Sequence, residues 1–180
     1  DRPLSRGLGD VYKRQLSVLP LFVLMGNLAN SANLSRNLYD AAYAIVGHYK
    51  GGLAMSTVGA CAGFGMICGS SIATAATMSQ MAGPEMKRHG YSDALISGSI
   101  ASGGTLGIII PPSVILVIYA YLTEQSVQEL FFAALIPGLI AVVLYMVAIR
   151  VYLVIYPSHG GHGNKMPLKE RIEAITKVFP

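Results

Sequence analysis

Charged side chains are scarce in this sequence of 180 residues: Asp, Glu, Lys and Arg make up 12% of it, against about 25% in a typical soluble domain. Three windows contain none of the four, residues 51–84, 94–123 and 130–149. Each window reaches or exceeds the roughly 20 apolar residues that a helix needs to cross a bilayer. The composition therefore excludes an ordinary soluble domain and predicts an all-α, polytopic membrane protein.

The few cysteines, the dispersed basic charge and the missing catalytic neighbours exclude further classes of protein. The only cysteines are Cys61 and Cys68, and on one helix they would be about 10 Å apart along the axis, too far for a disulfide. The net charge of +4 is not gathered in a basic patch interleaved with aromatic residues, so no nucleic-acid partner is expected. Covalent catalysis is disfavoured because Ser70 has no nearby histidine base and Cys68 has no positive neighbour. The sequence is not expected to be an enzyme.

Residues 51–84 are interrupted by a Gly-Ser-Ser run at residues 69–71. The window is too long for one span and too short for two, and the run divides it into halves of about 15 residues. Lys50 precedes the window and Lys87 follows it, and positive flanks prefer the cytoplasm. These features predict a re-entrant helical hairpin that enters from the cytoplasm and turns back at mid-membrane.

Residues 94–123 carry a second interruption. Pro111 and Pro112 cannot continue the hydrogen-bond ladder of a preceding helix, so two half-helices are expected to meet there. A Gly-Gly-Thr run at residues 103–105 is also of the helix-breaking kind. The loop that follows holds Glu124 and no Lys or Arg, which favours the periplasmic side. We therefore expect a discontinuous helix in this window.

The rest of the chain is assigned by composition. Residues 1–15 are polar and are interpreted as a non-native linker or adapter, outside the fold. Residues 157–180 are basic and Gly/His-rich, and they predict a cytoplasmic linker to a second half of the protein. Their two histidines, His159 and His162, fall short of the four ligands of a structural metal site. The expected order is a scaffold span and an interfacial amphipathic helix (residues 16–50), the hairpin and broken helix (51–123), and a second scaffold span (124–156).

The two breaks have a common chemistry. At each one, unpaired carbonyls at the end of one half-helix meet the positive N-terminus of the next. Sodium prefers neutral or anionic oxygen ligands, and a substrate carboxylate suits a helix N-terminus. No carboxylate lies within residues 51–84 or 94–123, which argues against a proton relay of the Asp/Glu type. The breaks are predicted to bind an ion and a substrate through neutral groups.

Packing is the competing interpretation of the small residues. Glycines recur four residues apart at 59 and 63, 65 and 69, and 103 and 107, a spacing typical of close helix contacts in membranes. Serine and threonine also often bond back to their own helix. We favour packing for the glycines and a binding role for the paired serines and prolines.

Three runs resemble one known family: LPLFVLMGN at residues 19–27, GSSIATAATM at 69–78 and GGTLGIIIPPS at 103–113. In this order and spacing they are similar to the first half of the large membrane subunit of tripartite ATP-independent periplasmic (TRAP) transporters. The resemblance implies one half of an inverted-repeat, elevator-type fold. The second half is expected to be absent from this sequence, so that the chain alone should not transport.

The same resemblance implies a sodium-coupled importer of organic acids, such as dicarboxylates or sialic acids, in the bacterial inner membrane. Its implied partners are a small membrane subunit, a periplasmic substrate-binding protein and the lipid bilayer, with sodium as the coupling ion and no other cofactor. Carried over position by position, the resemblance assigns the ion and substrate sites to Gly69, Ser70, Ser71, Gly104, Thr105, Pro111, Pro112 and Ser113. A channel-like subunit and a non-transporting membrane scaffold remain the alternatives.

Overall fold

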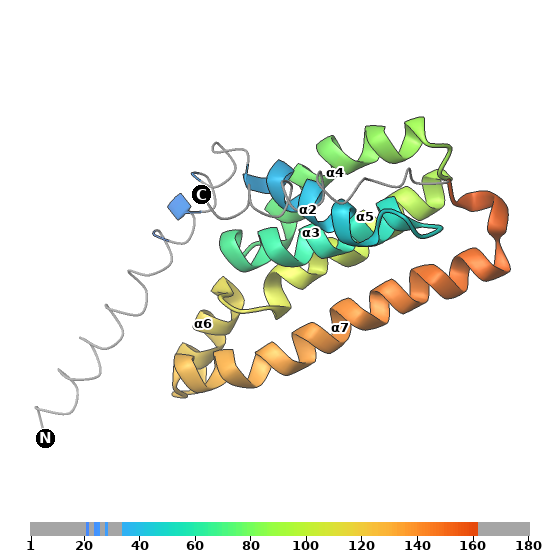
Figure 1. The fold of residues 1–180 in the computed structure, drawn as a ribbon. Coiled ribbons are helices and arrows are strands. Elements are labelled where there is room, and N and C mark those ends of the chain that lie inside the picture. The colour runs from blue at the N-terminus through green and yellow to red at the C-terminus, as the bar shows by residue number, and fades with distance from the viewer. Residues whose placement is uncertain (1–20, 22–23, 26–27, 29–33, 162–180) are drawn as a thin grey trace, which may run out of the picture.

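The computed structural model describes residues 21, 24–25, 28 and 34–161, and the elements in this part of the chain are helical (Figure 1). The segment predicted at residues 1–15, most of the span predicted at 16–32, and residues 162–180 of the linker predicted at 157–180 lie outside the described residues. The helices are α2 (Leu34–Val46), α3 (Gly52–Cys68), α4 (Ser71–Arg88), α5 (Asp93–Ile109), α6 (Val114–Leu122), α7 (Val127–Ile155) and the short 3₁₀ helix η1 (Pro157–His159). The predicted all-α class is confirmed.

Helices α3 and α4 are separated at the predicted Gly-Ser run. Gly69 follows α3 in the left-handed region, with φ 62° and ψ 14°, and its N–H donates to the Gly65 carbonyl at 2.8 Å. Glycine adopts this conformation without the steric cost that a Cβ would bring. The two helices have 17 and 18 residues, against the predicted length of about 15, and α4 continues past the predicted window through Pro84 to Arg88.

The two feet of this hairpin lie together. The N–H of Leu53, at the start of α3, donates to the Tyr91 hydroxyl at 3.4 Å, just beyond the end of α4. One turn further in, the hydroxyl of Thr57 donates to the sulfur of Met86 at 3.6 Å. Burial raises the pKa of the Tyr91 phenol above its usual range, so it stays a neutral hydrogen-bonding group at physiological pH. The chain enters and leaves the hairpin at the same end of the molecule.

Helices α5 and α6 form the predicted broken pair. α5 ends at Ile109 and α6 begins at Val114, with the axes bent by 44° across a break that contains the cis peptide bond between Pro111 and Pro112. The Gly-Gly-Thr run at residues 103–105 does not interrupt α5, so its assignment as a helix breaker was wrong. A glycine is tolerated inside a helix when close packing against a neighbouring helix offsets the low helix propensity of glycine.

Helix α3 lies at the centre and packs against α5, α2 and α4. Glycines of α3 and α5 make these contacts close. A Cβ added at Gly65 of α3 would lie 2.6 Å from the Cα of Gly107 in α5. A Cβ at Gly103 would lie 2.9 Å from the sulfur of Cys61, and one at Gly63 would lie 3.2 Å from Leu38. The packing interpretation is confirmed for Gly63, Gly65, Gly103 and Gly107.

Helix α7 runs alongside the other helices (Figure 1), and many of its apolar side chains are exposed. Phe132 is 76% exposed and Ile136 66%. Among the described helices α7 alone is long and apolar enough to cross a membrane, and α5 and α6 pass the same test as a bent pair. α7 is continuous through Pro137, and at Gly138 it packs against Ile110 in the α5–α6 break.

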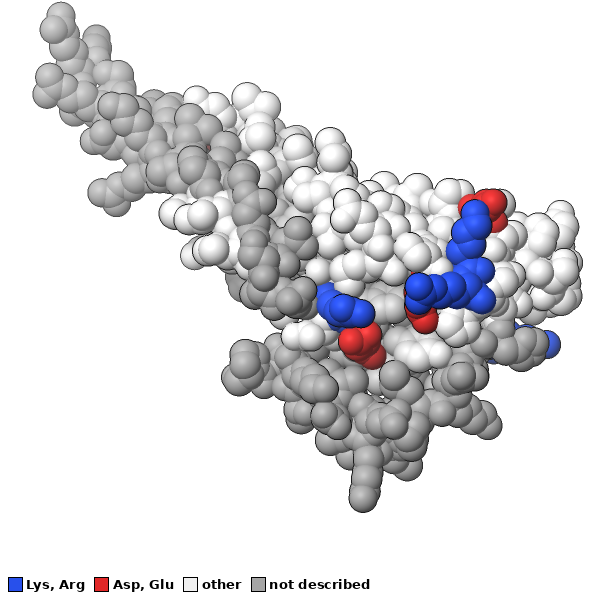
Figure 2. Space-filling model, turned by 90° about the horizontal axis from the view of Figure 1, so that it is seen from above, with Lys and Arg blue, Asp and Glu red and all other residues white. Residues whose placement is uncertain are grey.

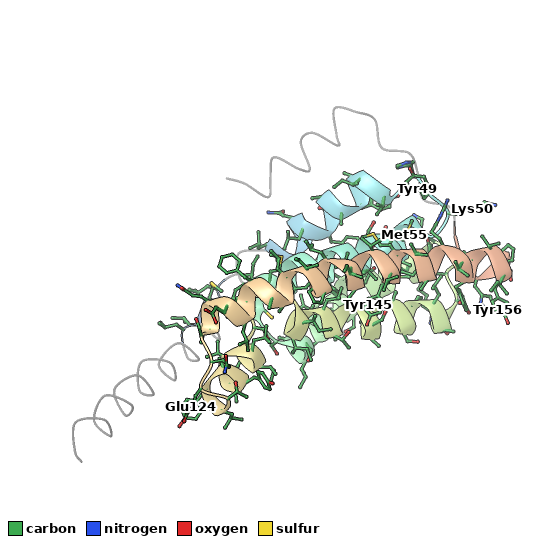
Figure 3. All side chains as sticks on the ribbon, turned by 90° about the horizontal axis from the view of Figure 1, so that it is seen from below. Tyr49, Lys50, Met55, Glu124, Tyr145 and Tyr156 are labelled. Carbon is green, nitrogen blue, oxygen red and sulfur yellow. The ribbon has the colours of Figure 1, made fainter. Side chains whose placement is uncertain are left out.

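The two ends of α7 differ in their charges. Lys50 and Tyr156 lie at one end of the molecule and Glu124 at the other (Figure 3). At the first end the Arg150 guanidinium donates to the Lys50 carbonyl at 3.5 Å and lies over the Tyr49 ring. The face in Figure 2 is largely uncharged, with its charged side chains gathered in a few places. The separation of Lys50 and Arg150 from Glu124 (Figure 3) suits a protein whose two ends meet water and whose middle meets lipid.

The backbone after α7 returns to the foot of the hairpin. The N–H of Ser92 donates to the His159 carbonyl at 3.1 Å, and the His159 ring forms a 2.7 Å hydrogen bond with the Tyr152 hydroxyl. Gly51, just before α3, lies against the side chain of Leu153. The end of α7 is therefore tied to both feet of the hairpin.

Cysteine labelling in the full-length protein tests the predicted topology. Lys50→Cys and Lys87→Cys, both at exposed positions, should react with an impermeant maleimide from the cytoplasmic side, and exposed Gln125→Cys from the opposite side. The unsubstituted protein is the control, because Cys61 and Cys68 are buried and should react slowly from either side. Labelling of positions 50 and 87 from opposite sides would show that the hairpin crosses the membrane.

Candidate functional site

The hairpin tip meets the α5–α6 break. A Cβ added at Gly69 would lie 3.3 Å from the Pro112 carbonyl oxygen and 3.6 Å from the backbone nitrogen of Val114. On the other side of the tip, a Cβ at Gly107 would lie 3.1 Å from the Ser70 carbonyl oxygen. The C-terminal ends of α3 and α5 and the N-terminal ends of α4 and α6 are therefore gathered in one place.

Ser70 forms the N-cap of α4. Its backbone is extended, with φ −131° and ψ 122°, and its hydroxyl oxygen accepts from the N–H of Ala73 at 3.4 Å. Ser71, the other candidate for the cap, is the first residue of the helix, and both serines are half-buried. The first N–H groups of α4 thus point out of a capped helix end, where the helix dipole favours negative charge.

Ser113 bridges the second break. It is 0% exposed, and its hydroxyl donates to the Ile108 carbonyl of α5 at 2.7 Å. It is also the N-cap residue of α6, although its side chain makes no capping bond there. Its proton is committed to α5, so its oxygen can act only as an acceptor towards any further group. Pro111 is buried beside it and Pro112 is half-buried.

Gly104 and Thr105 of the Gly-Gly-Thr run contact different helices, α4 and α7. A Cβ at Gly104 would lie 2.8 Å from the Cβ of Ala75 and 3.4 Å from the Ser71 carbonyl oxygen, so Gly104 borders the first turn of α4. The Thr105 hydroxyl instead donates to the Ser102 carbonyl at 2.6 Å and lies 3.3 Å from the Tyr145 hydroxyl of α7. The structure brings the other predicted site residues to the meeting of the breaks and leaves the Thr105 side chain on another face of α5.

Two residues at the tip were missed by the sequence reasoning. Thr74 is buried in the first turn of α4 and Cys68 is the last residue of α3, and both side chains contact the Ser70 carbonyl. The position of Thr74 four residues after Ser70 is a usable signal, since a threonine there can bond back to the i−4 carbonyl. The position of Cys68 carries no comparable local signal.

The fold and the site together define a class of protein. The chain is a polytopic α-helical membrane protein in which a helical hairpin and a broken helix bring their interruptions together. Such an arrangement offers helix ends and neutral oxygens within an apolar body, the construction used in ion-coupled secondary transporters.

Comparison with known proteins names the family. Residues 7–177 match the family described as "Tripartite ATP-independent periplasmic transporter, DctM component". The chain belongs to this family, as its three motifs implied. The match begins within the segment 1–15 that the composition set apart.

Curated relatives agree with this assignment. The chain is 43% identical over 136 residues to the C4-dicarboxylate TRAP transporter large permease protein DctM of Pseudomonas aeruginosa, covering 76% of the chain and 32% of the relative. It is 32% identical over 148 residues to the ectoine TRAP transporter large permease protein TeaC of Halomonas elongata (82% and 35%). It is 35% identical over 140 residues to the sialic acid TRAP transporter large permease protein SiaM of Vibrio cholerae (78% and 33%). The chain spans about a third of the length of these relatives, which are transporter permeases and not enzymes.

Proposed function

We propose that the chain forms the first half of the permease subunit of a sodium-coupled secondary active importer of organic acids, in the bacterial inner membrane. It would act with a periplasmic substrate-binding protein and a small membrane subunit, as one half of an inverted-repeat, elevator-type fold. Family membership supports transport, and the names of two relatives, for C4-dicarboxylate and sialic acid, support an acidic substrate.

The observation that carries this proposal is the meeting of the four helix ends around Gly69 and Pro112. A carboxylate at the N-terminus of α4 or α6 would gain the helix dipole and free N–H groups. A sodium ion at the C-terminal ends of α3 and α5 would gain carbonyl oxygens, and Ser113 would add a hydroxyl. Residues 51–84 and 94–123 contain no Asp, Glu, His, Lys or Arg, so transport through these elements would not require such a side chain to change its protonation.

The predicted residues take different roles under this proposal. Ser70 and Ser71 present the N-terminus of α4, and Gly69 and Gly104 keep the surrounding backbone free of side chains. Pro111 and Pro112 hold the break open, because neither can donate a backbone hydrogen bond. Thr105 would act through Tyr145 of α7 and not as a direct ligand, in keeping with its contacts.

Substitution of the tip serines in the full-length, assembled permease tests the proposal. Ser70→Ala removes a helix cap worth about 1 kcal/mol and should lower the initial rate of sodium-driven carboxylate uptake about fivefold. Ser71→Ala should act in the same direction. Exposed Ser79→Ala, later in α4, is the matched control and should leave uptake unchanged. Uptake would be measured in proteoliposomes with an imposed sodium gradient and a panel containing a C4-dicarboxylate and a sialic acid.

The same assay separates the alternatives. A sodium dependence unchanged in both tip variants would contradict the assignment of the ion site. Flux that neither saturates with substrate nor depends on sodium would favour a channel. A scaffold subunit would tolerate both Ser70→Ala and Pro112→Ala without loss of uptake by the assembled transporter.

A further inference from the structure

Thr74 is a buried polar residue at the tip of the hairpin. It is 0% exposed, one turn into α4, and its hydroxyl donates to the Ser70 carbonyl at 2.8 Å. The N–H of the same residue donates to the same carbonyl at 3.1 Å. One residue therefore holds the carbonyl of the helix-capping serine with both its backbone and its side chain.

The other half of the hairpin reaches the same carbonyl. The thiol of Cys68, the last residue of α3, lies 3.4 Å from the Ser70 oxygen and 3.5 Å from the Thr74 hydroxyl. Because the Thr74 proton is committed to Ser70, the thiol is the donor to either oxygen. The two side chains converge from opposite sides of the turn and join the two half-helices across it.

Helix α5 packs against the bonded groups of Ser70 and Thr74. A Cβ added at Gly107 would lie 3.1 Å from both the Ser70 carbonyl oxygen and the Thr74 hydroxyl. The backbone of α5 is thus in direct contact with the bonded groups. Hydrogen bonds enclosed in this way are strengthened by the low local dielectric, and a group that loses its partner there has no bulk water to replace it.

The hydrogen-bond partners of the Ser70 carbonyl define its structural role. The carbonyl accepts from two groups of Thr74, lies within reach of the Cys68 thiol and faces α5, so its acceptor capacity is taken up by the protein itself. Fixing this carbonyl fixes the orientation of the peptide groups beside it, including the Gly69–Ser70 turn and the Ser70 hydroxyl. Small changes in such orientations have large effects on a site built from backbone groups.

We propose that Thr74, assisted by Cys68, is a positioning residue that orients the hairpin tip for ion binding. The inference rests on the proposed function. It predicts that loss of the Thr74 hydroxyl weakens sodium binding even where the protein remains folded.

Thr57 provides a matched control within the same hairpin. It is also 0% exposed, donates to the i−4 carbonyl of Leu53 at 2.8 Å and has a sulfur partner in Met86 at 3.6 Å. It differs in lying near the feet of the hairpin and not at the tip. A general effect of removing a buried, back-bonded threonine would appear equally at both positions.

The experiment measures the sodium concentration that gives half-maximal thermal stabilisation of the purified full-length permease, with choline chloride keeping ionic strength constant. Thr74→Val should raise this concentration about three- to tenfold, as expected for a lost buried hydrogen bond. Thr74→Ser should restore it to within about twofold, and Thr57→Val should leave it within about twofold. Cys68→Ala, which removes the weaker thiol donor, should cause a smaller shift than Thr74→Val.

The outcomes separate the two proposals. A wild-type protein with no sodium-specific stabilisation would overturn both the proposed sodium coupling and the positioning role. A wild-type response that Thr74→Val and Cys68→Ala leave unchanged would overturn the positioning role alone. Equal shifts in Thr57→Val and Thr74→Val would also overturn it. If Thr74→Val does not fold, Cys68→Ala decides the question. A half-maximal sodium concentration in Cys68→Ala equal to that of the wild type would then overturn the positioning role.

Discussion

Gly65→Ala in the full-length permease is expected to reduce carboxylate uptake tenfold or more. The added methyl group would lie 2.6 Å from the Cα and 3.0 Å from the backbone nitrogen of Gly107, with Leu106 carbon at 3.6 Å. These are backbone atoms, so no rotamer change can relieve the contact and α3 must move away from α5. Overpacking of this kind costs about 1–3 kcal/mol, and the displacement falls one turn from the hairpin tip. Uptake in proteoliposomes and the thermal midpoint of the purified protein would both be measured.

Gly98→Ala is the matched control for this substitution. Gly98 lies in α5, and nothing is found within 4 Å of a Cβ added there. The variant gains the helix propensity of alanine, about 1 kcal/mol, without a steric cost, and should retain wild-type uptake. Full activity in Gly65→Ala would show that α3 and α5 do not pack in the way described.

Ser113→Ala is expected to have the second large effect, a fall in uptake of about tenfold together with a higher half-saturating sodium concentration. The substitution leaves the Ile108 carbonyl without the hydroxyl that donates to it at 2.7 Å. Leaving a buried acceptor unsatisfied costs about 1–3 kcal/mol. It also removes the oxygen that the α5–α6 break would offer to a cation. Sodium-dependent uptake, measured across a range of sodium concentrations at saturating substrate, checks both effects.

The matched control is Ser97→Ala. Ser97 donates to the i−4 carbonyl of Asp93 at 2.8 Å in an exposed turn of α5, where water can replace the lost bond. Ser113→Thr keeps the hydroxyl and should recover part of the sodium affinity that Ser113→Ala loses. The assignment of Ser113 to the ion site is rejected if Ser113→Ala lowers protein stability while its half-saturating sodium concentration stays at the wild-type value.

Both breaks could be predicted from the sequence because their causes are local. Glycine at position 69 permits a left-handed residue after α3, a serine caps the next helix, and two prolines remove backbone donors between α5 and α6. None of these effects depends on a distant neighbour. The spaced glycines of α3 and α5 could also be recognised as packing residues, although the partner of each one could not.

What the sequence could not supply is the direction in which each helix face points. The Gly-Gly-Thr run was expected to disturb its helix, yet Gly103 packs on Cys61 and Gly104 on Ala75, and these contacts with α3 and α4 accompany an unbroken α5. Thr105 faces α7 because the helix repeat places it on a different side from Gly104. Thr74 escaped notice because its second and third contacts come from α3 and α5, which are set by the tertiary fold.

The close contact of Gly65 with Gly107 has a mechanical consequence. With no side chain between the two backbones, α3 and α5 have nothing adjustable at that point, so a displacement of the hairpin tip must carry the end of α5 with it. The contacts of α7 are different in kind. Met146 reaches towards Gly59, and such a long, flexible side chain can change rotamer as surfaces slide. If one part of this protein moves against another during transport, the hairpin and α5 should travel as a single body, and the sliding surface should lie along the middle of α7, away from the end that is tied to the hairpin feet.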